Sequence, residues 1–121
     1  MIAIDPRKTY KFSVWIKSTD QSMDNLFGFQ LFNSNGYAIG GVWQNQYFKT
    51  SEKDENSWKQ WWAYLLPSNA GRGNCDRIET NGIDYCNSPD ARYVNFRLRS
   101  CYGDGNGLGT TYYMYPRIEE V

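Results

Sequence analysis

Several aromatic, amide and arginine side chains in this sequence have the chemistry needed to bind a sugar. A sugar ring presents an apolar face of C–H groups that stacks on an aromatic plane, and its hydroxyl groups hydrogen-bond to planar side chains such as Asn, Gln and Arg. Aromatic residues make up 17% of the 121 residues. Apolar and polar residues alternate along the predicted strands, and this pattern predicts that a set of candidate ligand-binding residues faces away from the core. These candidates are Trp15, Gln30, Asn95, Arg97, Trp62, Tyr64, Tyr113 and Tyr115.

Trp15 stands out because charged residues share its predicted face. Lys11 and Lys17 lie at even spacing from it, so that face should be solvated. Exposing an indole to water costs about 25 cal/mol per Å², so a sugar ring, a neighbouring subunit or the stems of the two lysines should cover it. We expect one solvent-facing surface, within reach of a single sugar residue, to hold four side chains: Trp15, Gln30, Asn95 and Arg97. The alternative is that the aromatic candidates belong to the core of a second sheet or contact a neighbouring domain.

Metal-binding and catalytic chemistry have less support. Asp104 and Asn106 alternate with glycines, and their side-chain oxygens are of the kind that Ca²⁺ binds. The later acidic residues of an EF-hand loop are missing, so a tight turn is the better explanation, and no other cofactor is expected. The chain has no histidine, the commonest general base. Its carboxylates cluster outside the apolar strands, so we expect no catalytic residues and no enzyme activity.

The three cysteines show no metal-binding spacing, because no CxxC pair is present. Cys75 and Cys86 lie in one polar, glycine-rich loop, and we expect a disulfide between them that leaves Cys101 alone. Closing such a short loop would stabilise the fold by about 3 kcal/mol in the chain-entropy model. The alternative is three reduced thiols.

Charge and hydropathy exclude two further classes of partner. The 13 Lys and Arg residues cancel the 13 Asp and Glu residues, which argues against a basic nucleic-acid-binding domain held by phosphate contacts. The longest purely apolar run covers only residues 61–66, far fewer than the roughly 20 residues that a membrane-spanning helix needs. We therefore expect no nucleic-acid partner and no membrane insertion.

Most of the chain alternates between apolar and polar residues with a period of two, which is typical of half-buried strands. We expect strands over residues 10–17, 25–33, 37–43, 46–50, 57–66, 92–100 and 110–119, with a long polar loop over 68–90. A turn is indicated at Asn33-Ser34-Asn35-Gly36. These elements predict a single all-β domain over residues 1–121, an antiparallel β-sandwich.

Several strand segments resemble a known family. Residues 4–17 are similar to the opening strand of jelly-roll domains of the carbohydrate-binding-module type, and residues 45–48, 58–67 and 112–119 resemble later segments of the same domains in the same order. Such domains occur in phage tail fibres, other virion appendages and extracellular bacterial proteins. They usually carry one or two strands before the segment that begins at Asp5, so we expect an N-terminal strand to be missing here.

Together these observations predict a non-catalytic, galactose-binding-like module that recognises a glycan on a virion fibre or an extracellular protein. The alternative is a structural β-sandwich that assembles into a fibre or filament through its exposed aromatics. Its partners would then be other copies of the chain or neighbouring domains of a longer protein. A small hydrolase is the third and least favoured hypothesis.

Overall fold

The computed structural model describes residues 1–18, 24–39, 48–50, 58–71, 84–102 and 110–121. These residues form strands and turns and contain no helix, and so no helix that could cross a membrane. The strands are β1 (Ile2–Ala3), β2 (Tyr10–Ser18), β3 (Asp24–Phe32), β4 (Phe48–Thr50), β5 (Lys59–Leu66), β6 (Tyr85–Cys86), β7 (Tyr93–Tyr102) and β8 (Thr111–Glu120).

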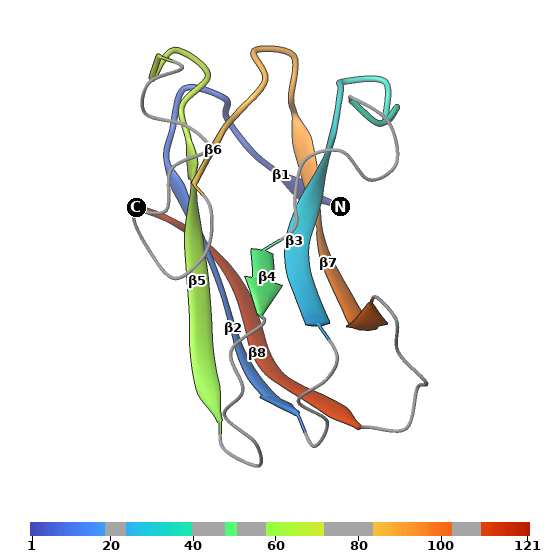
Figure 1. Ribbon diagram of the computed structural model, residues 1–121. Coiled ribbons are helices and arrows are strands. Elements are labelled where there is room, and N and C mark those ends of the chain that lie inside the picture. The colour runs from blue at the N-terminus through green and yellow to red at the C-terminus, as the bar shows by residue number, and fades with distance from the viewer. Residues whose placement is uncertain (19–23, 40–47, 51–57, 72–83, 103–109) are drawn as a thin grey trace.

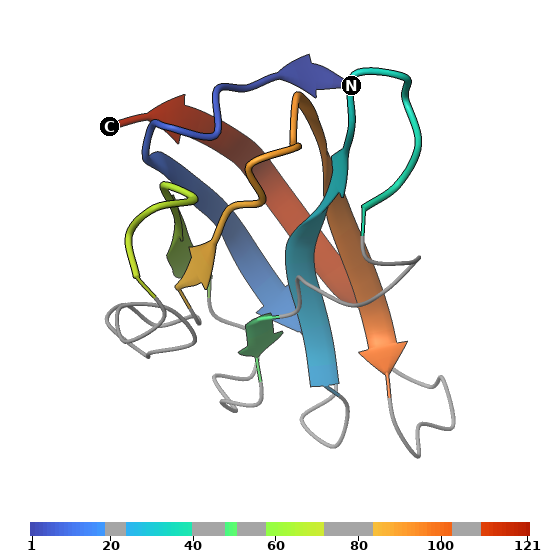
Figure 2. The same cartoon turned by 90° about the horizontal axis from the view of Figure 1, so that it is seen from above.

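The strands form two four-stranded sheets (Figure 1). The first sheet has the order β1-β7-β3-β4, and the second sheet has the order β6-β5-β2-β8. The view from above shows the two sheets as separate layers, with β3 and β7 in one and β2 and β8 in the other (Figure 2). Neighbouring strands are antiparallel except β5 and β6, which are parallel. The expectation of a purely antiparallel structure is therefore wrong at this pair.

The core lies between the two sheets, as the alternating pattern predicts. The second sheet contributes Phe12 and Val14 of β2 to the core, and the first sheet contributes Phe27 and Phe29 of β3. All four side chains are fully buried. The rings of Phe12 and Phe29 stack across the layers with their centroids 4.5 Å apart. Burial of these side chains is the main source of stability, since each large apolar side chain contributes about 1.5–3 kcal/mol.

A β-bulge interrupts the pairing of β2 with β8. Ser13 lies opposite Arg117, but Trp15 lies opposite Met114, so Tyr115 and Pro116 together face Val14 alone. Tyr115 has a φ of 53°, in the left-handed region that a bulge often uses and that glycine adopts at the lowest cost. The extra residue reverses the alternation along β8 on its two sides.

Turns at one end of the fold are held by specific hydrogen bonds. The predicted turn at 33–36 is confirmed: Gly36 N donates to Asn33 O at 3.0 Å, and Gly36 has a φ of 82°. Asn33 Oδ1 accepts from the backbone N–H groups of Asn35 and Tyr37. Of the strand predicted over 37–43, residues 37–39 contribute only an isolated bridge between Ala38 and Phe32, and residues 40–43 lie outside the described part.

The first residues of the chain form a strand of their own. Ile2 pairs with Val94 and Ala3 with Tyr93, which puts β1 at the edge of the first sheet. β1 is only two residues long, so it adds little pairing beyond this corner of the sheet. The segment that follows β1 crosses over to the second sheet, where β2 begins (Figure 1).

Candidate functional site

The outer face of the second sheet is built from alternate residues of β2, β5 and β8. Since Phe12, Val14 and Ile16 of β2 face the core, the residues between them face outward. The register places Lys11 between Tyr64 and Glu119, Ser13 between Trp62 and Arg117, and Trp15 between Gln60 and Met114; Lys17 lies beside Tyr112. We call this surface the aromatic face, and its residues are Lys11, Ser13, Trp15, Lys17, Gln60, Trp62, Tyr64, Tyr112, Met114, Arg117 and Glu119.

Trp15, Trp62 and Tyr64 are all partly exposed on the aromatic face. This confirms that Trp15 shares its face with the two lysines and that Trp62 and Tyr64 point the same way. Ser13 is only 3% exposed although it faces outward. It lies between Trp62 and Arg117, so larger side chains than its own cover it.

The two lysines contact neighbouring aromatic rings. Lys11 Nζ lies 5.9 Å from the ring centroid of Trp62, and Lys17 Nζ lies 5.9 Å from that of Tyr112. Cation–π contacts at exposed sites contribute about 0.5–1 kcal/mol each. The ammonium groups therefore sit over these two rings, while Trp15 has Gln60 and Met114 as its cross-strand neighbours.

The predicted single surface of four residues is wrong. Trp15 belongs to the second sheet, whereas Gln30, Asn95 and Arg97 belong to β3 and β7 of the first sheet. Those three are close to one another, because Gln30 pairs directly with Asn95 and Arg97 pairs with Gly28. Alternation assigns a residue to a face of its own strand, but it does not say to which sheet the strand belongs.

Gln30 also differs from the prediction in its burial. It points away from the buried Phe29 side of β3, yet it is only 2% exposed. Its Oε1 accepts a hydrogen bond from Arg97 Nη2 at 2.7 Å. The buried Gln30 and the partly exposed Arg97 therefore form a hydrogen-bonded pair on the first sheet, and Gln30 is not available to a ligand in this conformation.

The β8 bulge separates Tyr113 from Tyr115, although strict alternation predicts that both point outward on one face. Tyr113 packs against the hydrophobic core, so its predicted outward orientation is wrong. Tyr115, at the bulge, is 66% exposed. Met114 and Tyr112 take the outward positions beside Trp15 and Lys17 instead, and no strict alternation could have predicted this exchange.

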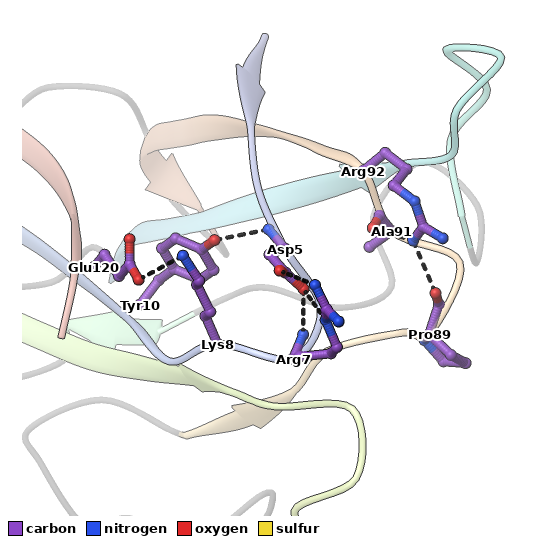
Figure 3. Close-up of polar contacts among 8 residues, drawn as sticks. All are labelled: Asp5, Arg7, Lys8, Tyr10, Pro89, Ala91, Arg92 and Glu120. Atoms are coloured by element: carbon purple, nitrogen blue, oxygen red, sulfur yellow. Dashed lines mark hydrogen bonds and ion pairs between the residues drawn. The ribbon is translucent and has the colours of Figure 1, made fainter.

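Sequence reasoning missed a pocket at one end of the fold. It has a volume of about 530 Å³ and is lined by Ile4, Asp5, Pro6, Arg7, Ser68, Pro89 and Arg92. Three segments far apart in the sequence supply these residues, namely the stretch before β2, the turn after β5 and the turn before β7 (Figure 3). The alternation of apolar and polar residues within one β-strand gives no signal for such a site, because only the tertiary fold brings the segments together.

An ion pair dominates the electrostatics of this pocket. Arg7 Nε and Nη2 donate to the two carboxylate oxygens of Asp5 at 3.0 and 2.8 Å, and Arg7 N donates to Asp5 Oδ1 at 2.9 Å. The side-chain hydrogen bonds from Arg7 are the largest cause that holds the pKa of Asp5 far below its usual range. The same contact raises the pKa of Arg7. Asp5 is therefore ionised at every ordinary pH.

A buried carboxylate lies beside β5, on the edge of this strand that faces away from β2. Asp84 is 1% exposed, and its Oδ1 accepts a hydrogen bond from Tyr64 N at 2.9 Å, just before β6 begins to pair with β5. The side chain thus takes the place of a backbone acceptor at the sheet edge. Asp84 lies outside the strands, as the sequence predicts for the carboxylates, but the fold buries it all the same.

The remaining sequence predictions fall partly outside the described residues. Cys86 is in a disulfide bond, and its predicted partner, Cys75, lies outside the described part. Asp104 and Asn106, the weak calcium candidates, lie outside it as well. Within the described part, no group of three or more Cys, Asp or Glu side chains could hold a metal ion.

Comparison with known proteins identified no relative. No protein-family model, no curated protein and no solved structure matches the chain. The surfaces that the fold itself presents are therefore the basis for assigning a function.

Proposed function

We propose that this protein is a non-catalytic glycan-recognition module and that the aromatic face is its binding surface. The observation that carries the proposal is the presence of Trp15, Trp62 and Tyr64 together on the outward side of one sheet, all partly exposed. Each aromatic plane can stack on the C–H face of a sugar ring, an interaction worth on the order of 1 kcal/mol. Several such contacts are needed for useful affinity.

Polar groups around the aromatic rings favour sugars over a purely apolar ligand. Gln60 lies beside Trp15, and Arg117 and Glu119 lie along the β8 side of the face, where they form an ion pair of 2.8 Å. Amide, guanidinium and carboxylate groups supply both donors and acceptors, which the hydroxyl groups of a sugar require.

The length of the aromatic face favours an oligosaccharide over a single sugar. Lys11 and Lys17 lie six residues apart on β2, which corresponds to roughly 20 Å of extended strand. Aromatic side chains accompany β2 over this whole length, from Tyr64 beside Lys11 to Tyr112 beside Lys17. A chain of sugars lying along β2 would contact more of them than one ring could.

We further propose that the fold is a jelly roll and that the protein is extracellular or part of a virion. Two four-stranded sheets, between which the chain crosses repeatedly, support the first part. The disulfide bond at Cys86 supports the second, since such bonds persist in oxidising surroundings and are rare in the cytosol.

The alternative function is assembly into a fibre through exposed aromatics. It is favoured by the exposure of Tyr112 and Tyr115, which are 48% and 66% accessible on β8. β8 lies at the edge of the second sheet, and exposed aromatics on an edge strand suit contacts with another subunit.

A glycan-array screen followed by calorimetry distinguishes the two functions. We expect binding to at least one glycan, weakened about fivefold by Trp15→Ala or Trp62→Ala, with circular dichroism unchanged. Tyr37→Ala is the matched control, because Tyr37 is 70% exposed but lies in the 33–37 turn beyond β3. Absence of glycan binding together with oligomers that Tyr112→Ala dissolves would select assembly instead.

A further inference from the structure

Backbone hydrogen bonds connect the segments that line the pocket at the end of the fold. Ile4 N donates to Arg92 O at 2.9 Å, and Ser68 N donates to Pro6 O at 2.8 Å, so the three segments that line the pocket are tied to one another. Asp5 N donates to the hydroxyl of the buried Tyr10 at 2.7 Å. A pocket built in this way needs little reorganisation to accept a ligand.

Arg92 is fixed at the pocket from both its backbone and its side chain. Its backbone N–H donates to Phe32 O at 2.8 Å. Its Nη1 donates to the carbonyl oxygens of Pro89 and Ala91 at 2.9 and 2.8 Å, as Figure 3 shows for Pro89. Within the described part of the chain, the Nε and Nη2 groups of Arg92 have no hydrogen-bond partner. These two groups form one planar donor edge of the guanidinium.

The pocket carries one unbalanced positive charge. The carboxylate of Asp5 is neutralised by its two-point contact with Arg7, and neighbouring Lys8 is paired with Glu120 at 2.9 Å. No carboxylate in the described part forms an ion pair with Arg92. The net charge of the ionisable residues that line the pocket, Asp5, Arg7 and Arg92, is therefore +1.

We propose that this pocket binds a sugar acid through its carboxylate, with Arg92 as the anchoring residue. A carboxylate matches the planar donor edge of a guanidinium and accepts two parallel hydrogen bonds from it. A single negative charge also balances the +1 of the lining, whereas a doubly charged phosphate would leave an excess charge near Asp5.

The other lining groups favour a sugar over an acidic peptide side chain. Asp5 is ionised and can only accept hydrogen bonds, so a ligand beside it must donate, as hydroxyl groups do. The side chain of Ser68 can do both. Ile4, Pro6 and Pro89 supply apolar contact for a ring, and about 530 Å³ accommodates one or two sugar rings. This site is distinct from the aromatic face and does not depend on the proposed function.

Amide chemical shifts of the ¹⁵N-labelled full chain during titration with D-glucuronate test the proposal. We expect shifts at residues 4, 5, 7, 68 and 90–92, and an affinity at least tenfold higher than for D-glucose, which has the same ring without the carboxylate. Arg92→Gln should abolish the shifts, and Arg92→Lys should weaken binding severalfold because it keeps the charge but loses the planar edge. Arg117→Gln, which removes an arginine from the aromatic face, should leave the glucuronate-induced shifts at the pocket unchanged.

Four results would overturn the proposal: no shifts at these residues, equal binding of glucose, retained binding in Arg92→Gln, or equal binding of N-acetyl-aspartate, which would indicate an acidic peptide. Since Arg92→Gln could loosen the 89–91 turn, its spectrum must first match that of the unmodified chain, and Arg92→Lys provides the test if it does not. Glucuronate shifts confined to the aromatic face would contradict this pocket and leave the proposed function intact.

Discussion

Trp15 on β2 lies directly opposite Met114 on β8, although Ser13, only two residues earlier, lies opposite Arg117. The bulge at Tyr115 and Pro116 accounts for this offset. It turns Tyr113 toward the core and leaves the outward positions to Met114 and Tyr112. The shape of the aromatic face therefore depends on one irregularity in an edge strand.

The positive φ of Tyr115 predicts that glycine fits this position better than alanine. A non-glycine residue in the left-handed region costs about 1 kcal/mol. We expect Tyr115→Gly to be more stable than Tyr115→Ala by up to about 1 kcal/mol, since both variants lose the ring but only one keeps the strain. Thermal unfolding followed by circular dichroism measures the difference. A lower melting temperature for the glycine variant would show that the bulge does not impose this conformation.

The stacked pair Phe12 and Phe29 should be among the most sensitive positions in the chain. Both side chains are fully buried, and truncation of a buried phenylalanine costs about 3–5 kcal/mol. We expect Phe29→Ala to lower the free energy of unfolding by this amount in urea. Tyr37→Ala, at an exposed position, should change it by no more than about 0.5 kcal/mol. Equal effects of the two variants would contradict the assigned core.

The low pKa of Asp5 predicts a pH-dependent contribution to stability. Hydrogen bonds from the Arg7 side chain and backbone lower this pKa in the folded state, so the folded protein holds the proton less tightly than the unfolded chain does. The contribution is therefore fully present above the unfolded pKa, about 3.9, and is lost as the pH falls below it. Urea midpoints of the unmodified chain and Asp5→Asn, measured from pH 7 to pH 2, should differ most above pH 4 and converge in acid. A constant difference over the whole range would refute this.

The disulfide bond at Cys86 predicts protection from alkylation. Intact-mass analysis without reductant should show at most one modified thiol per chain, and after reduction it should show three. The pairing of Cys86 with Cys75 stays a prediction, which peptide mapping tests directly. Three alkylated thiols before reduction would contradict the bond.

The sequence predicts individual strands well, but not how they combine. Local alternation located the core positions of β2 and β3, because one face of each strand must be apolar when the other is not. The assignment of β2 to one sheet and of β3 and β7 to the other depends on crossovers, which leave no local pattern. For this reason local alternation correctly predicts that Trp15 lies on a solvated face, but wrongly groups it with Gln30, Asn95 and Arg97.

The pocket at Arg92 shows a second limit of local patterns. Each of its lining residues is an ordinary turn residue when read in its own segment. The segments meet because Ile4 pairs with Arg92 and Pro6 with Ser68 through their backbones, contacts between residues 62 or more positions apart in the sequence. Burial of Gln30 on the side of β3 away from the core is a comparable case, since its contact with Arg97 also joins two strands.

The most direct test of the central claim is the location of glycan contacts on the surface. Transverse relaxation-optimised spectra of the ¹⁵N-labelled chain should be recorded with the best glycan from the array. We predict that the indole N–H signals of Trp15 and Trp62 and the amides of β2, β5 and β8 shift on binding, while those of β3 and β7 stay in place. Glycan-induced shifts confined to the first sheet, with both indole signals unchanged, would contradict the aromatic face as the recognition surface.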